Sequence, residues 1–249
     1  MKKCIGGITI FIIACNSSEK NLIYEDSTNK FYVKTEESKK GALVDTLYKF
    51  YDINKPSEIK ETGFYKDGFQ NDLWSYNLPK EVKTIKWGYY KDKYLNFETN
   101  LFQEVDSIKH GGFFSNFLFN TESGKIVLTV SINGPFKDSL PARNYERITK
   151  QEFFEMGATP LSFTTETLTD AAAHIYINQI AVKTSANAIK YIKGCFGFID
   201  KQEFVEISVS SSVENNFYAD ELFNAVLTHF VINGKHLYNP FKKEDRLCF

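Results

Sequence analysis

The sequence predicts an α+β fold, in which an antiparallel sheet is packed by one or two helices and is preceded by a small aromatic β-meander. Three observations support this prediction. Aromatic and polar residues alternate between positions 41 and 92, three strand patterns follow one another between positions 174 and 210, and an apolar stripe at helical spacing covers residues 218–230. A period of two is typical of strands, and recurrence after three and four residues is typical of helices.

The composition bounds the class of protein before any element is assigned. The chain has 249 residues, of which 43% are hydrophobic and 16% aromatic, and this is too apolar for a disordered chain. Thirty basic residues face 31 acidic ones, so the chain lacks the basic surface that nucleic acid requires as a main partner. No apolar run reaches the roughly 20 residues of a membrane-spanning helix.

The first 14 residues read as a secretion signal. Lys2 and Lys3 precede a short apolar run over residues 5–14, which ends in Ile-Ile-Ala before Cys15. This junction resembles the bacterial lipoprotein lipobox. The resemblance implies cleavage before Cys15, attachment of diacylglyceryl and palmitate chains there, and an outer-membrane address because Asn16, not Asp, follows the cysteine. The predicted membrane contact is therefore the lipid on Cys15.

Residues 15–40 are polar and are predicted to be a tether, with a short strand near residues 22–24 or 31–33. Residues 41–92 form the predicted meander. Gly63-Phe-Tyr-Lys-Asp67 is repeated as Gly88-Tyr-Tyr-Lys-Asp92, and Lys66-Asp67-Gly68 is a hairpin-turn signal.

The meander resembles the MORN-type repeat, a β-hairpin unit of secreted and surface bacterial proteins. Gly63, Tyr65, Gly68 and Trp74 fit the pattern of that repeat, whereas Asn71-Asp72 stands where a glycine is expected. The resemblance implies a stack of aromatic hairpins, and the segment is too short for an independent stack.

Residues 93–249 read as a larger domain. Predicted strands cover residues 94–98, 113–119, 125–132, 174–182, 188–198 and 203–210. A helix is predicted from Thr149, where Glu152 has capping-box spacing, to Gly157. A second helix covers residues 218–230, packs on the sheet through its apolar stripe and ends at Asn233-Gly234.

This order of elements, together with the segment Tyr94-Leu-Asn-Phe-Glu-Thr-Asn-Leu-Phe102, resembles the PsbP-like fold and secreted lipoproteins of the DcrB type. The Pro and Trp that often follow the opening strand in that family are absent. The resemblance covers residues 93–249 and implies a non-enzymatic assembly or stabilising factor. It brings no catalytic residue with it.

No catalytic, metal or cofactor site is predicted. The four histidines, His110, His174, His229 and His236, lack metal-ligand spacing, and phosphate-binding loops are absent. Asp220 and Glu221 are interpreted as negative charges in the first turn of a helix.

Ligand or partner candidates come from the aromatic residues. Trp74, Tyr76, Trp87 and Tyr89 lie on alternating strands, so they either face outward as a binding platform or form the core of the meander. By alternation His174 shares a strand face with Tyr176, either on the floor of a polar groove or on a solvated sheet face.

Two cysteines remain after the predicted cleavage, Cys195 and Cys248. Outside the cytoplasm they can form one disulfide, or they can stay as two separate thiols that pack as small apolar groups.

These observations predict an outer-membrane lipoprotein that acts as a non-enzymatic binding or assembly module with an envelope protein partner. The alternative is a lipoprotein that binds a small molecule or glycan through exposed aromatic residues. A third hypothesis, a hydrolase, would need a cleft that holds His174 or convergent carboxylates.

Overall fold

The structure is a computed structural model that describes residues 22–26, 30–40, 43–121, 124–133, 155, 158–170, 173–184, 186, 188–199, 203–212 and 216–243. Strands predominate in these ranges, together with one described helix, α2 (Asn216–His229). The predicted α+β class is therefore wrong. The described chain is mainly antiparallel β-structure in two large sheets that enclose the helix.

The first sheet has ten described strands in the order β16-β15-β7-β6-β5-β4-β3-β2-β1-β17, each antiparallel to its neighbours. Their bounds are β1 Leu22–Glu25, β2 Lys30–Lys40, β3 Leu43–Asp52, β4 Lys55–Lys66, β5 Phe69–Asn77, β6 Val82–Asp92, β7 Phe97–Phe102, β15 Val231–Ile232, β16 Lys235–His236 and β17 Phe241–Lys243. Strands from both ends of the described chain meet here, because β1 pairs with β17.

The second sheet has seven described strands in the order β11-β12-β13-β14-β10-β9-β8. Their bounds are β8 Ser107–Gly111, β9 Phe114–Thr121, β10 Gly124–Asn133, β11 Thr159–Asp170, β12 Ala173–Lys183, β13 Ile189–Ile199 and β14 Glu203–Ser212. Val205, Ile207 and Val209 of β14 are fully buried, which confirms the face predicted from the alternation of that strand.

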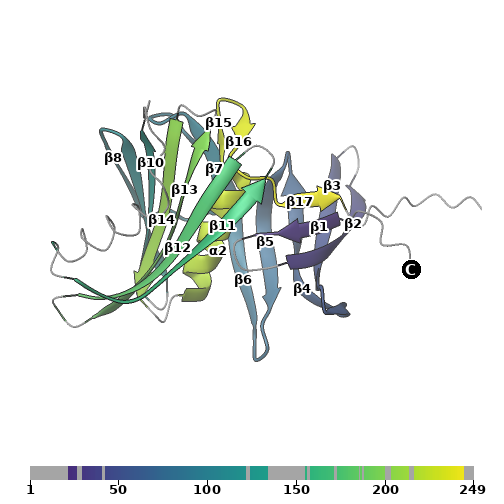
Figure 1. Ribbon diagram of the computed structural model, residues 1–249. Helices are drawn as coiled ribbons and strands as arrows, with labels where there is room; N and C mark the ends of the chain where they lie inside the picture. The colour runs from purple at the N-terminus through teal and green to yellow at the C-terminus, as the bar shows by residue number, and fades with distance from the viewer. Residues whose placement is uncertain are drawn as a thin grey trace, which may run out of the picture.

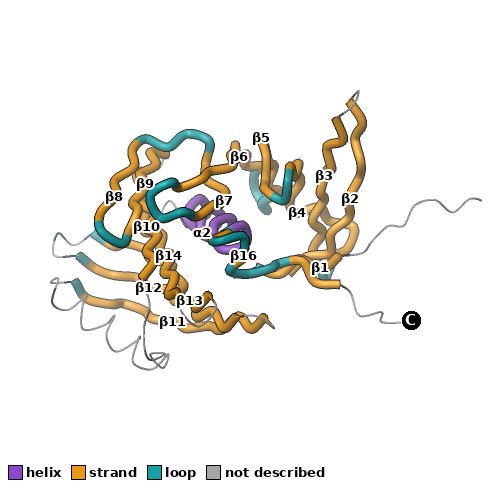
Figure 2. The backbone as a smooth tube through the Cα atoms, turned by 90° about the horizontal axis from the view of Figure 1, so that it is seen from above, coloured by secondary structure: helices purple, strands orange, loops and turns teal. Residues whose placement is uncertain are grey.

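Helix α2 lies between the two sheets (Figures 1 and 2). It packs against β13 and β14 on one side and against β7 on the other. Every residue from Leu222 to Phe230 is buried, so the helix is covered all round from Leu222 onward and not on one stripe as predicted. Within the described ranges, no helix is both long enough and apolar enough to cross a bilayer.

The predicted segment boundaries are less distinct in the structure. Lys30–Lys40, expected in a polar tether, is strand β2. Strand β7 pairs along its whole length with Trp87–Asp92 of β6, so the ten-stranded sheet continues across the boundary predicted at residue 92. The reason is that the meander supplies one wall of the shared core.

Several local predictions are confirmed and others are corrected. Asp67 and Gly68 have the positive φ angles of a tight hairpin turn. Strand β7 begins at Phe97 after a turn, not at residue 94. Asn233 and Gly234 form the β15–β16 turn and do not end α2, which stops at His229. The helix predicted near Thr149 lies, Glu155 aside, outside the described residues.

Candidate functional site

Three of the predicted aromatic candidates belong to the core. Trp74, Tyr76 and Trp87 are 0%, 2% and 1% exposed. The Trp87 indole Nε1 donates a hydrogen bond to the Tyr76 hydroxyl at 2.9 Å, and the Trp74 Nε1 donates to the Phe64 carbonyl at 3.2 Å. Of the two alternatives left open for these residues, an outward platform or the core of the meander, the core alternative therefore holds for all three.

The other candidates lie in separate sheets. Tyr89 of β6 is 52% exposed. Tyr176 of β12 is half-buried and its ring stacks on Phe196 at 4.8 Å. The backbone of His174 pairs with Thr169 at the end of β12, and its side chain lies outside the described residues. The six candidates therefore do not form one site.

The cysteine predictions stay predictions. Cys195 lies on β13 and is buried with a free thiol, and burial raises its pKa far above the usual range. Cys15 and Cys248 lie outside the described residues.

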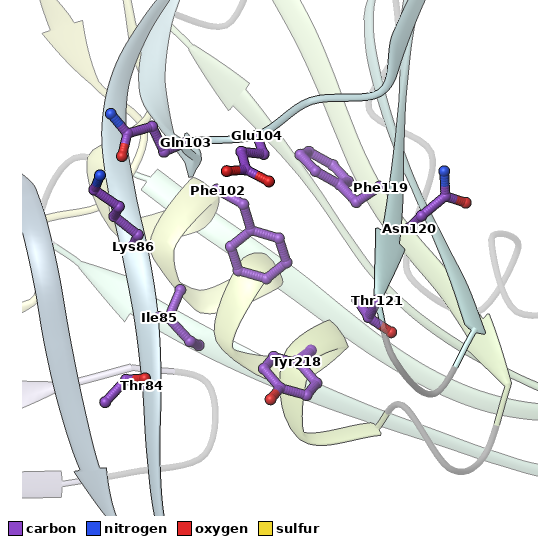
Figure 3. Close-up of a pocket in the computed structure, with 10 residues that line it drawn as sticks. All are labelled: Thr84, Ile85, Lys86, Phe102, Gln103, Glu104, Phe119, Asn120, Thr121 and Tyr218. Carbon is purple, nitrogen blue, oxygen red and sulfur yellow. The ribbon is translucent and has the colours of Figure 1, made fainter.

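A groove opens where β6 and β7 of the first sheet face β9 of the second sheet beside the start of α2 (Figure 3). We call it the intersheet groove, and its volume is about 370 Å³. Its lining residues are Thr84, Ile85, Lys86, Phe102, Gln103, Glu104, Phe119, Asn120, Thr121 and Tyr218. Strands β6, β7 and β9, with α2, all contribute to it.

The floor of the intersheet groove is apolar. The half-buried Phe102 lies at its centre, with its ring 5.3 Å from Phe119 and 6.5 Å from Tyr218, both edge-on. Exposed polar side chains of both charges, Lys86 and Glu104 among them, form the rim. An apolar floor inside a polar rim is the usual anatomy of a binding site.

A second cavity, of about 610 Å³, brings carboxyl groups together between β4 and α2. Glu61, Asp220 and Glu221 all line it. Burial and the nearby carboxylates raise the pKa of Glu221 to about 8, and burial together with Glu221 raises the pKa of Glu61 well above its ordinary value. Asp220 and Glu221 are not first-turn charges, because α2 begins at Asn216 and has no acidic residue in its first turn.

Convergent carboxyl groups are the pattern expected of a general acid and base. Here, however, the Tyr76 hydroxyl that accepts from Trp87 also hydrogen-bonds Glu221, which ties the helix to the sheet. Among the described residues, no group of three His, Cys, Asp or Glu side chains could hold a metal ion. We therefore interpret the acidic cavity as part of the framework.

Sequence reasoning missed Phe102, Phe119 and Tyr218. Phe119 was assigned to a strand and Tyr218 to a helix, but their meeting depends on the packing of two sheets whose relative placement no local pattern encodes. The one available signal was the aromatic content of 16%, which does not say which rings meet.

No protein-family model and no curated protein sequence matches the chain. Among solved structures, it is similar to the solution structure of cyanobacterial PsbP (CyanoP) from Synechocystis sp. PCC 6803. The identity is 13% and the TM-score 0.45, over 59% of this chain and 92% of that one.

Proposed function

We propose that this protein is a non-enzymatic binding module of the bacterial envelope, anchored in the outer membrane by a lipid on Cys15. The intersheet groove would receive an apolar side chain of an envelope protein partner. The observation that carries the proposal is the floor of this groove, where Phe102, Phe119 and Tyr218 converge from three elements below an open mouth.

The dimensions of the groove favour a protein partner. A volume of about 370 Å³ accommodates one or two large side chains, which is how anchor residues fill pockets at protein interfaces. The rim carries Lys86 and Glu104, and a rim with both signs of charge supports specific contacts around such an anchor.

The anchor part of the proposal rests on the sequence. A lipidated Cys15 would be joined to β1 by the few residues up to Leu22. Several acyl chains hold a protein at a membrane far more firmly than one chain does, so the domain would stay within reach of envelope partners.

Site-specific photo-crosslinking in cells tests the groove. Benzoylphenylalanine replaces Asn120, which is exposed on the groove rim. The matched control replaces Leu73, which is 55% exposed on β5 and does not line the groove. We expect a discrete crosslinked product from Asn120 and none from Leu73. The same pattern from both positions, or no product from Asn120, contradicts the groove proposal.

The anchor is tested separately by Cys15→Ser. The variant should move from the membrane to the soluble fraction and lose the Asn120 crosslink. Membrane retention of the variant would refute lipid anchoring while leaving the crosslinking result of the native chain to stand on its own.

A further inference from the structure

Strands β5 and β6 pair over only part of their length. Where they separate, a side chain forms hydrogen bonds to their backbone in place of the ladder. Their backbone ladder runs from Asn77 and Val82 to Asp72 and Trp87 and stops there. Beyond it, the buried amide of Asn100 on β7 replaces the ladder. Its Oδ1 accepts from the Gln70 amide at 2.9 Å, and its Nδ2 donates to the carbonyls of Gln70 and Gly88 at 2.7 and 3.2 Å.

A recess opens at this separation, with a volume of about 520 Å³. We call it the Tyr89 recess, and its lining residues are Lys66, Asp67, Phe69, Gln70, Asn71, Tyr89 and Glu98. None of them belongs to the intersheet groove, so an inference about this recess goes beyond the proposed function and does not depend on it.

An exposed aromatic ring forms one side of the recess and is held in place. Tyr89 is 52% exposed. Phe69 meets its ring edge-to-face at 4.9 Å, and its hydroxyl hydrogen-bonds Glu98. Glu98 is in turn fixed by Lys91 Nζ at 2.7 Å from its Oε1. The ring therefore offers an oriented apolar surface to a ligand.

A buried polar group completes the recess. Gln70 is 6% exposed, yet its Oε1 has no hydrogen-bond partner among the described residues. Its backbone cannot shift to find one, because Asn100 holds both the N–H and the carbonyl of Gln70. A buried polar atom without a partner is costly. Gln70 lines the recess, so a turn of its side chain toward a bound ligand would supply the missing hydrogen bond.

We propose that the Tyr89 recess binds a saccharide. A sugar ring has an apolar face that can lie against Tyr89 and hydroxyl groups that can bond Gln70. A hydroxyl both donates and accepts, so it satisfies either end of an amide. Purely apolar ligands leave Gln70 without a partner. Multiply charged anions are disfavoured, because Glu98 is already paired with Lys91 and the other charged lining residues are one carboxylate, Asp67, and one ammonium, Lys66, which leaves no excess of positive charge.

The test uses the full-length chain in a zwitterionic detergent, because detergents with sugar head groups would compete. An array of defined mono- and oligosaccharides is screened first to rank sugars by binding. Maltotetraose, cellotetraose, chitotetraose and the best sugars from the array are then titrated by calorimetry. We expect saturable binding by at least one. Tyr89→Ala should weaken it at least tenfold, and Gln70→Leu should weaken it while the fold is kept.

Tyr94→Ala is the matched control, because Tyr94 is also 52% exposed and does not line the recess. It should bind the same sugar as the native chain does. The proposal is overturned if no sugar binds, or if Tyr89→Ala and Tyr94→Ala affect binding equally. Loss of sugar binding would leave the Asn120 crosslink unaffected, so failure here is distinguishable from failure of the proposed function.

Discussion

The ammonium of Lys193, which has no exposed side-chain surface, lies 3.1 Å from the carboxylate oxygen Oδ1 of Asp220. Lys193 belongs to β13 and Asp220 to α2, so this ion pair joins the helix to the seven-stranded sheet. The same Oδ1 accepts from the Tyr191 hydroxyl at 2.9 Å, and the ammonium lies 5.1 Å from the ring centre of Phe223. A buried lysine is thus satisfied by one charge and one aromatic face.

We expect mutation of Asp220 and mutation of Lys193 to lower the free energy of unfolding by different amounts. Asp220→Ala leaves a fully buried ammonium without its counter-ion, and this should cost about 3–5 kcal/mol of unfolding free energy. Lys193→Met leaves Asp220, whose side chain is 30% exposed and still accepts from Tyr191, so the loss should be clearly smaller. Urea unfolding of both variants measures the difference. Equal losses would mean that the buried charge is not the dominant cost.

A matched control for the lysine is Lys190→Met on the same strand. Lys190 is exposed, and surface substitutions of this kind usually change stability by less than about 0.5 kcal/mol. The control therefore separates the effect of burying the charge from that of placing a methionine on β13.

The pH dependence of stability should report the proton on Glu221. Burial and neighbouring carboxylates raise its pKa from 4.5 to about 8, so the folded chain keeps a proton that the unfolded chain releases. Stability should fall as pH rises through this interval, by about 1.4 kcal/mol per pH unit for one such group. Burial lowers the pKa of His229 from 6.5 to about 4, which acts in the opposite sense, but only below pH 6.5. The window from pH 6.5 to 8 therefore isolates the carboxyl groups.

Glu221→Gln mimics the protonated form and should flatten this dependence in thermal unfolding between pH 6.5 and 8. Glu61, whose pKa is also raised, should leave a residual slope. Glu98→Gln is the control: hydrogen bonding to Lys91 lowers the pKa of Glu98, so it titrates outside the window. A native chain whose stability does not change from pH 6.5 to 8 would contradict protonation of Glu221.

The side chain of Asn100 should contribute more to the free energy of unfolding than an ordinary buried amide does. Asn100→Leu leaves the Gln70 amide and the carbonyls of Gln70 and Gly88 without their partner. With about 1–3 kcal/mol for each buried group left unsatisfied, we expect a loss of at least about 3 kcal/mol. Hydrogen exchange gives a local measure: the Gln70 amide should exchange faster, whereas Thr84, in the intact β5–β6 ladder, should change only with global stability. Unchanged protection of Gln70 would show that Asn100 does not replace the ladder.

Local sequence patterns predicted individual strands and helices better than they predicted how these elements pack into layers. The alternation of Val205, Ile207 and Val209 identified both β14 and its buried face, because a period of two is a property of the strand itself. The apolar stripe identified α2 for the same reason. That stripe predicted packing against one sheet only. In the structure, residues outside the stripe are also buried, namely Asn224, Ala225 and Thr228. Enclosure by a second sheet is a tertiary effect that no single segment encodes.

The same limit explains the candidate sites. Strand alternation allowed Trp74 and Trp87 to face either way, and both are buried in the structure through tertiary packing that alternation does not encode. Tyr89 follows Trp87 by two positions on the same strand, yet it is half exposed, because β5 leaves β6 just beyond Trp87. The side chain of Asn100, which lies 30 residues from Gln70 in the chain, bridges that separation.

The two equivalent glycines of the internal repeat have different surroundings in the structure. Gly63 and Gly88 occupy equivalent positions in the repeated motif, but a Cβ on Gly63 would overlap the ring of Trp74, whereas a Cβ on Gly88 meets only the Gln103 Cα at 3.8 Å. Gly63→Ala should therefore cost about 1–3 kcal/mol through overpacking, and Gly88→Ala should be neutral or slightly stabilising, because it reduces the freedom of the unfolded chain. Denaturant unfolding of the two variants measures this difference. Trp74→Phe, which supplies a smaller ring, should recover part of the loss in the Gly63→Ala background. Equal effects of the two alanines would mean that contact with Trp74 does not determine the cost of a side chain at Gly63.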